Sequence, residues 1–509
     1  MKESRSYSSV RRTKNWVKNG IRSPYNIMVA AAVAALACLV IVPLIEMVVT
    51  TFKLAARDVR RVEGAQAGDW SLYYWKKLLC SEVSQNMLYK PLMHSLLIAT
   101  AVSVFSIGLG GAIAWLMVRS DLPFKKFFSL AMIVPYMIPS WCKSMAWIAV
   151  FKTARIGGTQ GFLSYLGLEP PDWLAYGPVA IICVLTIHYY AYAYLLISAS
   201  FRSINSELEE MGEILGAGKL LMLRKITFPL VMPAIASSFI LIFSKAMGTF
   251  GVPAFLGLKT GYYTISTMLY TSIKQQQTAM AFSISLILIG IAAVIIFINQ
   301  QVIGTRKSYA TIGGKGGRSN VLSLNKWKPM VVCLLFLFLG FCVFLPIGIL
   351  VLQSLMLKLG DYSPSNFSLH YWVGLGKPDI FYGEPGVFRN PQFLQVLGNS
   401  LKLVVVASLV ATVFGQLIGY VTSRGRQLKS GKLVEQLVFI PYLIPSIAFG
   451  AMYLSMFSVE RAVTFAGLKV TFFPVLYGSF LLLVLVTVVK NLPFSSRAGS
   501  ANMMQINVE

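Results

Sequence analysis

The sequence predicts an all-α, polytopic membrane protein with ten transmembrane helices. Of its 509 residues, 56% are hydrophobic and only 13% are charged, and the mean hydropathy is +0.67. A soluble protein of this length would be about a quarter charged. The apolar residues also gather in blocks of about 20 or more, which is long enough to cross about 30 Å of hydrocarbon at about 1.5 Å per helical residue.

The first apolar block is expected to stay in the protein as a span. It follows a basic segment, residues 1–26, it is itself long enough to cross the membrane, and it lacks the small-residue cleavage site of a signal peptide. The ten spans are expected at 27–52, 94–118, 127–151, 177–200, 231–257, 279–301, 330–356, 397–422, 434–457 and 470–490.

The net charge of +26 lies between the spans and does not gather on one recognition face. Basic residues collect in the N-terminal segment 1–26 and in the acid-free connection 302–329. Lysine and arginine in short connections keep those segments on the cytoplasmic side of a membrane, so we expect both segments inside the cell. The pattern indicates a lipid bilayer as partner and argues against nucleic acid.

Cysteine and histidine give no sign of a cofactor or a reaction. Five of the six cysteines fall inside apolar blocks, and no CxxC motif or Cys/His cluster occurs. The three histidines are far apart, and no Ser/His/Asp set or pair of carboxylates has a workable spacing. We therefore expect no metal site, no cofactor and no catalytic centre in this chain.

The second half of the chain repeats the first in the same orientation. Three segments recur in the same order at offsets of 297, 305 and 306 residues, which chance matches would not preserve. The alternative is that membrane helices simply resemble one another. The matched pairs are DWSLYYW (69–75) with NFSLHYW (366–372), the segments 94–120 and 399–425, and VPYMIPS (134–140) with IPYLIPS (440–446).

The repeat divides the chain into two units. The first repeat, 27–301, holds six spans and a polar stretch at 201–230, and the linker 302–329 joins it to the second repeat, 330–509, with four spans. The last five residues, QINVE, match SINSE (203–207), so the second copy stops before its polar stretch and two further spans. We expect a truncated chain, or else a separate polypeptide that supplies the remainder.

The polar stretch contains EEMGEILGAGKLLMLRKITFP (209–229), whose GAGK does not form a phosphate-binding loop. Such a loop needs a glycine five residues before the Gly-Lys pair and Ser or Thr after it. Here Glu213 and Leu220 occupy those positions, so we expect no nucleotide bound to this chain.

The stretch is expected to fold as two short helices. Asn205 or Ser206 can cap the first helix, Gly216 and Gly218 interrupt it, and Pro229 ends the second element before the next span. The alternative is an ordinary amphipathic connection in the lipid headgroups. The apolar side of the second helix is expected to carry Leu220, Leu223 and Ile226.

The spacing within this stretch resembles the EAA loop of permeases in binding-protein-dependent ABC importers. That motif reads E-A-A, three residues, G, nine residues, I-x-L-P, and every spacing is kept here, although Ala-Ala becomes Met-Gly and the Leu becomes Phe. The resemblance implies that the loop docks as short helices into a groove on a cytoplasmic ATPase dimer. The coupling residues implied are Glu210, Gly216, Ile226 and Pro229.

The resemblance extends over the whole chain, and GTFGVPAFLG (248–257) is similar to fused two-unit permeases for ferric iron. It implies a multi-pass protein of a bacterial cell membrane that passes a solute delivered by an external binding protein, while a separate chain hydrolyses ATP. Ferric iron is the expected solute. The alternatives are an importer of the same class for thiamine, aminoethylphosphonate or polyamine, or else an ion-coupled secondary transporter.

Few polar residues lie within the predicted spans, and charges at that depth usually face a cavity or a partner. Lys245 and His188 are the candidates for the translocation pathway, although a packed histidine is an alternative for His188. Lys402 and Lys490 lie near predicted span ends, where they are expected to snorkel. Prolines are expected to kink the third span of each repeat, at Pro135, Pro139, Pro441 and Pro445.

Overall fold

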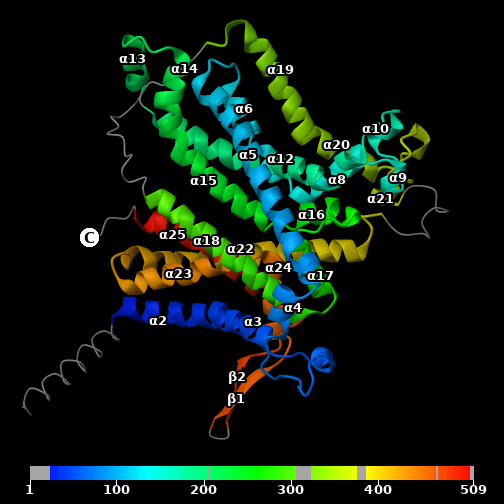
Figure 1. Cartoon of the computed structure of the whole chain (residues 1–509), viewed down its shortest axis with the longest axis vertical. Coiled ribbons are helices and arrows are strands. Elements are labelled where there is room, and N and C mark those ends of the chain that lie inside the picture. The colour runs from blue at the N-terminus through cyan, green and yellow to red at the C-terminus, as the bar shows by residue number, and fades with distance from the viewer. Residues whose placement is uncertain (1–22, 205, 305–322, 375–385, 466–467, 505–509) are drawn as a thin grey trace, which may run out of the picture. The chain divides into compact units, whose positions relative to one another are not determined.

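The computed structural model describes residues 23–204, 206–304, 323–374, 386–465 and 468–504 (Figure 1). The described chain is helical apart from isolated bridges and one antiparallel hairpin, β1 (Arg461–Phe465) with β2 (Leu468–Phe473). The predicted all-α class is confirmed. Most of the basic N-terminus and of the predicted linker lies outside the described residues.

Among the described residues, eight helices are long and apolar enough to span a membrane, or nine if one bent pair counts as a single span. They are Pro24–Phe52 (α2, η1 and α3), Gln85–Arg119 (η3 and α5), Asp172–Ser203 (α11 and α12), Leu223–Met247 (η4 and α15), Thr278–Ile295 in α18 (Thr278–Gly304), Asn325–Ser354 (η7, α19, η8 and α20), Pro391–Arg424 (α22) and Phe480–Met504 (α25).

Two predicted spans are broken as expected, before Pro139 and Pro445, whereas Pro441 lies inside a helix. The predicted span 127–151 is divided into α6 (Lys125–Ala131), α7 (Val134–Met137) and α8 (Ser140–Phe151). The predicted span 434–457 is the bent pair, α23 (Lys429–Leu443) and α24 (Ser446–Phe457). Ile138 and Ile444, each before a proline, adopt extended ψ angles of 125° and 127°, because proline disfavours the helical conformation in the residue before it.

The last predicted span is displaced along the chain. The prediction placed it at 470–490, but β2 occupies the start of that range and the helix α25 runs from Phe480 to Met504. The segment LKVTFF is rich in β-branched and aromatic residues, which fit a strand better than a helix. Lys490 consequently lies in the middle of a helix and not at its end.

Shorter elements connect the spans. They are η2 (Ala56–Arg61), α4 (Tyr73–Cys80), α9 (Ala154–Gly157), α10 (Phe162–Tyr165), α13 (Ser206–Ile214), α14 (Lys219–Met222), α16 (Gly251–Leu256), η5 (Leu258–Thr260), α17 (Ile265–Lys274), η9 (Pro364–Asn366) and α21 (His370–Val373).

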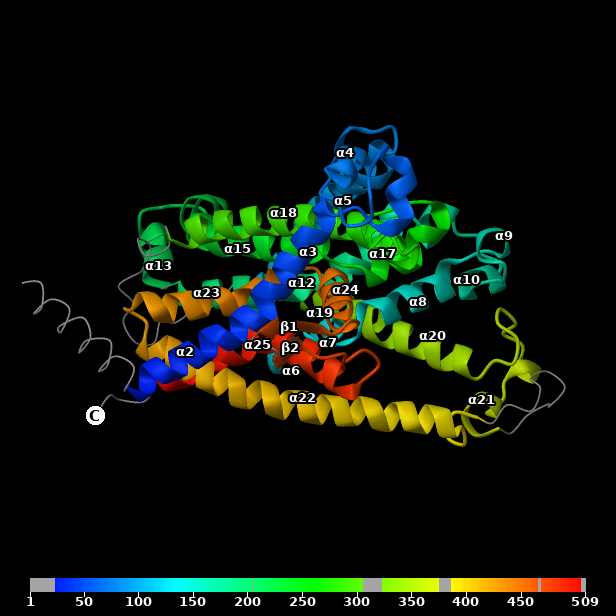
Figure 2. The ribbon, with the colours of Figure 1, turned by 90° about the horizontal axis from the view of Figure 1, so that it is seen from below.

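The helices form two compact units, each built from parts of both predicted repeats. Unit 1 comprises the described parts of 1–77, 272–289 and 392–509, and unit 2 those of 78–271 and 290–391. In unit 1, α2 (blue) runs beside α23 (orange), as Figures 1 and 2 show. The first span of each sequence repeat therefore packs in the compact unit that holds the later spans of the other repeat.

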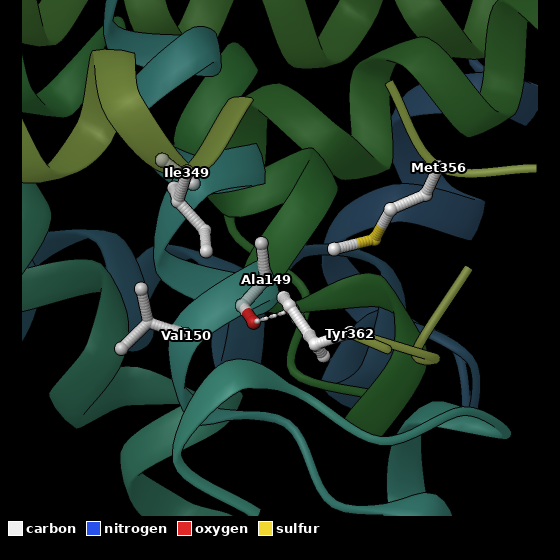
Figure 3. Packing of buried hydrophobic residues seen from close by; sticks show 6 residues of the cluster. Ala149, Val150, Ile349, Met356 and Tyr362 are labelled. Atoms are coloured by element: carbon white, nitrogen blue, oxygen red, sulfur yellow. Dashed lines mark hydrogen bonds between the residues drawn. The ribbon is translucent and has the colours of Figure 1, made fainter. Parts of the chain in front are cut away.

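Unit 2 also combines parts of both repeats, because α8 of the first repeat packs against α20 of the second. Ala149 and Val150 of α8 form a buried cluster with Ile349 of α20 and with Met356 and Tyr362 beyond it (Figure 3). The Tyr362 hydroxyl donates a hydrogen bond to the Ala149 carbonyl oxygen at 3.4 Å. This buried contact fixes the broken third span of the first repeat in place.

Glycines allow the second and fourth spans to approach closely in each repeat. A Cβ atom on Gly110 of α5 would lie 2.5 Å from the carbonyl oxygen of Tyr190 in α12 (Pro178–Ser203). Likewise, a Cβ on Gly415 of α22 would lie 2.5 Å from the Cβ of Ser495 in α25. The two glycines are matched positions of the sequence repeat, which favours two copies of one packing arrangement.

The loop after the first span is also anchored in the same way in each repeat. The Trp75 Nε1 donates to the Thr51 hydroxyl at 3.2 Å, and the Trp372 Nε1 donates to the Ser354 hydroxyl at 3.1 Å. The same pair of segments is joined by a backbone bond of 2.7 Å in both copies, from Ser71 to Phe52 and from Ser368 to Leu355.

Asp121, in the connection after α5, holds the last residues of the predicted linker 302–329. Its carboxylate accepts hydrogen bonds from Lys328 Nζ at 2.6 Å, the Leu324 backbone N–H at 2.8 Å and the Ser323 hydroxyl at 2.9 Å. The Lys328 bond, with help from the Leu324 N–H, lowers the pKa of Asp121 to about 2.

We predict an acid-dependent contribution from Asp121 to stability. Because the pKa of Asp121 is lowered in the folded protein, its contribution to stability is complete above its unfolded pKa of about 4. That contribution is lost as the pH falls through about 2. Thermal unfolding of the purified chain in detergent should therefore show a wild-type midpoint that falls more than that of Asp121→Asn between pH 5 and pH 2. Parallel pH profiles for the two proteins would contradict this assignment.

Candidate functional site

The predicted coupling stretch folds as two short helices joined by a tight turn. The helix α13 ends in a Schellman arrangement, in which the Ala217 N–H donates to the Gly212 carbonyl and the Gly216 N–H donates to the Glu213 carbonyl, both at 2.9 Å. Gly216 has a φ of +80°, in the left-handed region that glycine adopts without strain. The predicted interruption at Gly216 is confirmed.

A second glycine lets the two short helices touch. Gly212 is buried, and a Cβ at this position would lie 3.2 Å from the Ile226 side chain and 3.4 Å from the Met222 sulfur. The motif that the stretch resembles has alanine here. The substitution of glycine therefore leaves room for a closer approach of the following turn.

The turn presents an apolar surface, which we call the loop tip: Met211, Ile214, Leu215 and Leu221. The side chains of Ile214 and Leu215 are each 85% exposed, and those of Met211 and Leu221 are more than half exposed. Burial of such residues within a protein is ordinarily favourable, so this degree of exposure marks a contact surface.

The exposed face agrees only in part with the one predicted from periodicity, since Leu223 is exposed as expected. Ile226 faces inward onto Gly212 and is only partly exposed, whereas Ile214 and Leu215, which the prediction did not single out, are outermost. The side chains of Ser206 and Leu220, and Asn205 as a whole, lie outside the described residues.

Of the four predicted coupling residues, Glu210 and Gly216 keep their expected setting, whereas Ile226 and Pro229 do not. Glu210 is exposed beside the loop tip, Gly216 forms the turn, and Ile226 joins the two short helices. Pro229 does not end an element. It lies at the second position of α15 (Phe228–Met247), which continues directly from the π-helical turn η4 (Leu223–Thr227).

A second polar site lies at the break of the third span in unit 2. Lys143 of α8 is only 4% exposed. Its ammonium donates to the Pro135 carbonyl oxygen at 2.6 Å and lies 2.8 Å from Nδ1 of His188 in α12. The proline break thus frees a carbonyl, and a buried lysine satisfies it.

Tyrosines from α7 and α12 lie around His188. The Tyr136 ring stacks on the imidazole with centroids 5.0 Å apart, and the hydroxyls of Tyr136 and Tyr192 are hydrogen-bonded to each other. We call Tyr136, Lys143, His188 and Tyr192 the break cluster. The predicted pathway residue Lys245 is next to it, because its backbone carbonyl accepts a hydrogen bond from Tyr189 at 3.4 Å.

The structure therefore brings the two predicted pathway residues, His188 and Lys245, into one neighbourhood. It adds Tyr136 and Lys143, which sequence reasoning did not assign to the pathway. The sequence signal for Tyr136 was its place between the two prolines of VPYMIPS. The grouping itself depends on how α7 and α12 meet, which spacing along the chain does not reveal.

The second repeat has a comparable site in unit 1. Lys490 of α25 donates hydrogen bonds to the carbonyl oxygens of Pro441 and Ile444 at the break between α23 and α24. The expectation that Lys490 snorkels to the membrane surface is wrong, because α25 is centred further along the chain than predicted. Among the residues that the structure describes, no group of three or more His, Cys, Asp or Glu side chains could hold a metal ion.

Comparison with known proteins relates part of the chain to a family. Residues 106–304 match the family described as "Binding-protein-dependent transport system inner membrane component". This range includes the break cluster, the coupling stretch and Lys245.

Curated relatives match over most of the chain. The Ferric transport system permease protein FbpB of Actinobacillus pleuropneumoniae is 24% identical over 84% of this chain and 58% of its own length. The Putative ferric transport system permease protein FbpB 1 of Haemophilus influenzae is 24% identical over 84% of this chain and 63% of its own length. The chain thus spans about 60% of the length of these two relatives.

The family match contains the coupling stretch, and the spans around it are apolar helices of membrane length. The chain is therefore a multi-pass membrane protein whose residues 106–304 match the family of binding-protein-dependent transport system inner membrane components, and it is similar over most of its length to ferric transport permeases.

Proposed function

We propose that this chain is the transmembrane permease subunit of an ATP-driven importer. In this proposal an external binding protein delivers the solute, the spans pass it inward, and a separate cytoplasmic ATPase dimer docks on the coupling stretch. ATP hydrolysis then takes place on that partner and not on this chain.

The loop tip is the observation that carries the proposal. Ile214 and Leu215 are 85% exposed at the end of a helix whose turn is fixed by Gly216. A short helix with an exposed apolar end fits a groove on a partner protein, with acidic Glu210 and Glu213 beside it to set orientation. A headgroup-lying connection is less well supported, because such helices carry basic residues on the polar face and α13 carries acidic ones.

Ferric iron is the solute we propose, because the relatives that cover most of the chain are ferric transport permeases. Thiamine and aminoethylphosphonate importers remain alternatives within the same class. A polyamine is disfavoured, since the buried Lys143 would repel a cation passing the break cluster.

An ion-coupled secondary transporter has less support. Such a protein would be expected to place an acidic residue within its spans for proton or sodium coupling. Glu46, in α3 (Val42–Phe52), is acidic, but its carboxylate accepts a hydrogen bond from the Arg461 guanidinium at 2.8 Å and so already has a cationic partner.

The solute is tested by uptake into cells that lack this gene and into cells that carry it again. We predict that uptake of labelled ferric iron falls at least 10-fold in the deletion strain and recovers on complementation, while uptake of thiamine, aminoethylphosphonate and spermidine is unchanged. Loss of one of those three solutes with iron uptake intact would overturn the choice of solute but leave the transporter class standing.

A further inference from the structure

We propose that the break cluster is a binding site for a multi-oxygen anion, and that the solute crosses as an oxyanion complex rather than as a bare metal cation. The inference rests on the proposed import function for the identity of the solute. The site itself is argued from the side chains and can be tested without transport.

The break cluster contains a buried cation, Lys143, without a carboxylate partner among the described residues. Lys143 is buried, with only 4% of its surface exposed. Its hydrogen-bond partners are a carbonyl oxygen and an imidazole, both uncharged. The ion pairs formed by the described residues do not include Lys143. A charge in such surroundings is costly unless an opposite charge approaches it, so the site is suited to an anionic ligand.

The hydrogen bonds of the break cluster orient donors toward a ligand. With the Lys143 ammonium donating to Nδ1 of His188, the neutral imidazole carries its proton on Nε2 and presents an N–H group. Tyr136 and Tyr192 add two phenolic hydroxyls beside the imidazole, hydrogen-bonded to each other. The cluster therefore offers donors to a ligand's oxygen atoms and lacks the carboxylates that would hold a bare ferric ion.

The second repeat places an ammonium at the equivalent carbonyl, but from a different helix. With an offset of 306, Pro135 corresponds to Pro441 and Lys143 to Phe449, and the offset of 302 between SINSE and QINVE relates His188 to Lys490. Lys490 reaches Pro441 from α25, and its ammonium lies 5.2 Å from the Phe449 ring centroid.

The lysine thus lies on the third span in the first repeat and on the fourth span in the second repeat. One repeat has lysine on the broken span and histidine on the fourth span, and the other has phenylalanine on the broken span and lysine on the fourth. A positive charge at this carbonyl is common to both, although no single sequence position carries it. This placement favours a requirement for charge over a requirement for one particular packing.

These features define the ligand by its chemistry. It carries several oxygen atoms and negative charge, as do inorganic phosphate, a tricarboxylate such as citrate, and ferric iron held by either of them. A bare trivalent ion would meet the unneutralised Lys143 charge and be repelled.

The test is binding of radiolabelled citrate and, separately, inorganic phosphate to the purified complex in detergent, by equilibrium dialysis. Lys143→Gln keeps a hydrogen-bond donor for the Pro135 carbonyl but removes the charge, and we expect anion binding to weaken about 10- to 100-fold, as for loss of a charged hydrogen bond. Lys402→Gln, at an exposed position of α22, is the matched control and should bind like wild type.

A double substitution separates charge from packing. Lys143→Phe alone should lose anion binding, and Lys143→Phe with His188→Lys, which copies the second repeat, should recover most of it. Wild-type affinity in Lys143→Gln, or binding of ferric ion in the absence of any oxyanion, would overturn the proposal. Failure of the proposed function would look different: the wild-type complex would bind anions normally and show no ATP-driven uptake of iron.

Discussion

Replacement of both Ile214 and Leu215 with aspartate should abolish association with the ATPase and should stop transport, with the permease still inserted and folded. The two side chains are each 85% exposed, so their loss removes little internal packing. Apolar anchors at the centre of a docking surface commonly contribute about 2 kcal/mol or more each, so two buried carboxylates in their place should weaken binding by more than about 1,000-fold.

The measurement is co-purification of the ATPase with tagged permease from membranes, together with the thermal midpoint of each permease alone. Leu166→Asp with Leu168→Asp is the matched control, because both leucines are more than half exposed in a different connection. Normal co-purification of the loop-tip variant would show that the ATPase docks elsewhere. An equal loss in the control variant would point to general damage by surface charge.

Gly110→Val should prevent stable packing of α5 against α12. Valine adds a Cβ that would lie 2.5 Å from the Tyr190 carbonyl oxygen and 2.8 Å from both the Ala193 Cβ and the Tyr194 nitrogen. Two of these three atoms belong to the backbone, so the helices must move apart. Overpacking of this kind costs about 3 kcal/mol, and small residues at helix contacts are what allow close packing in a membrane.

The measurement is the yield and the thermal midpoint of the purified chain. Gly108→Val is the matched control: it lies on the same helix two residues earlier, and a Cβ there would meet nothing within 4 Å. We expect at least a 5-fold loss of folded protein for Gly110→Val and close to wild-type yield for Gly108→Val. Similar yields for the two variants would contradict the close approach of α5 and α12.

Much of the fold follows from local sequence. Apolar length predicted the spans, because a membrane imposes one length scale on every helix. The prolines of VPYMIPS and IPYLIPS predicted both broken spans, since proline acts on its own backbone and on the residue before it. Gly216 predicted the turn for the same reason, as the left-handed φ is a local requirement.

Prediction from the sequence failed where contacts between distant segments determine the structure. The apolar run 470–490 held a strand and the start of a helix, and hydropathy does not distinguish the two. The turn at Gly216 changes the direction of the chain between α13 and α14. The apolar periodicity of the second helix therefore does not predict which residues of the first helix are exposed. The break cluster and the Lys490 bonds depend on contacts between helices some 45 to 49 residues apart in sequence.

The central claim is that this chain imports a solute with energy from ATP hydrolysed on a partner. It is tested most directly in proteoliposomes that contain the purified complex, with binding protein and labelled ferric iron outside and ATP inside. The account predicts accumulation of iron that requires the binding protein and hydrolysable ATP and that the Ile214→Asp, Leu215→Asp variant abolishes. Accumulation driven by a proton or sodium gradient without ATP would contradict it.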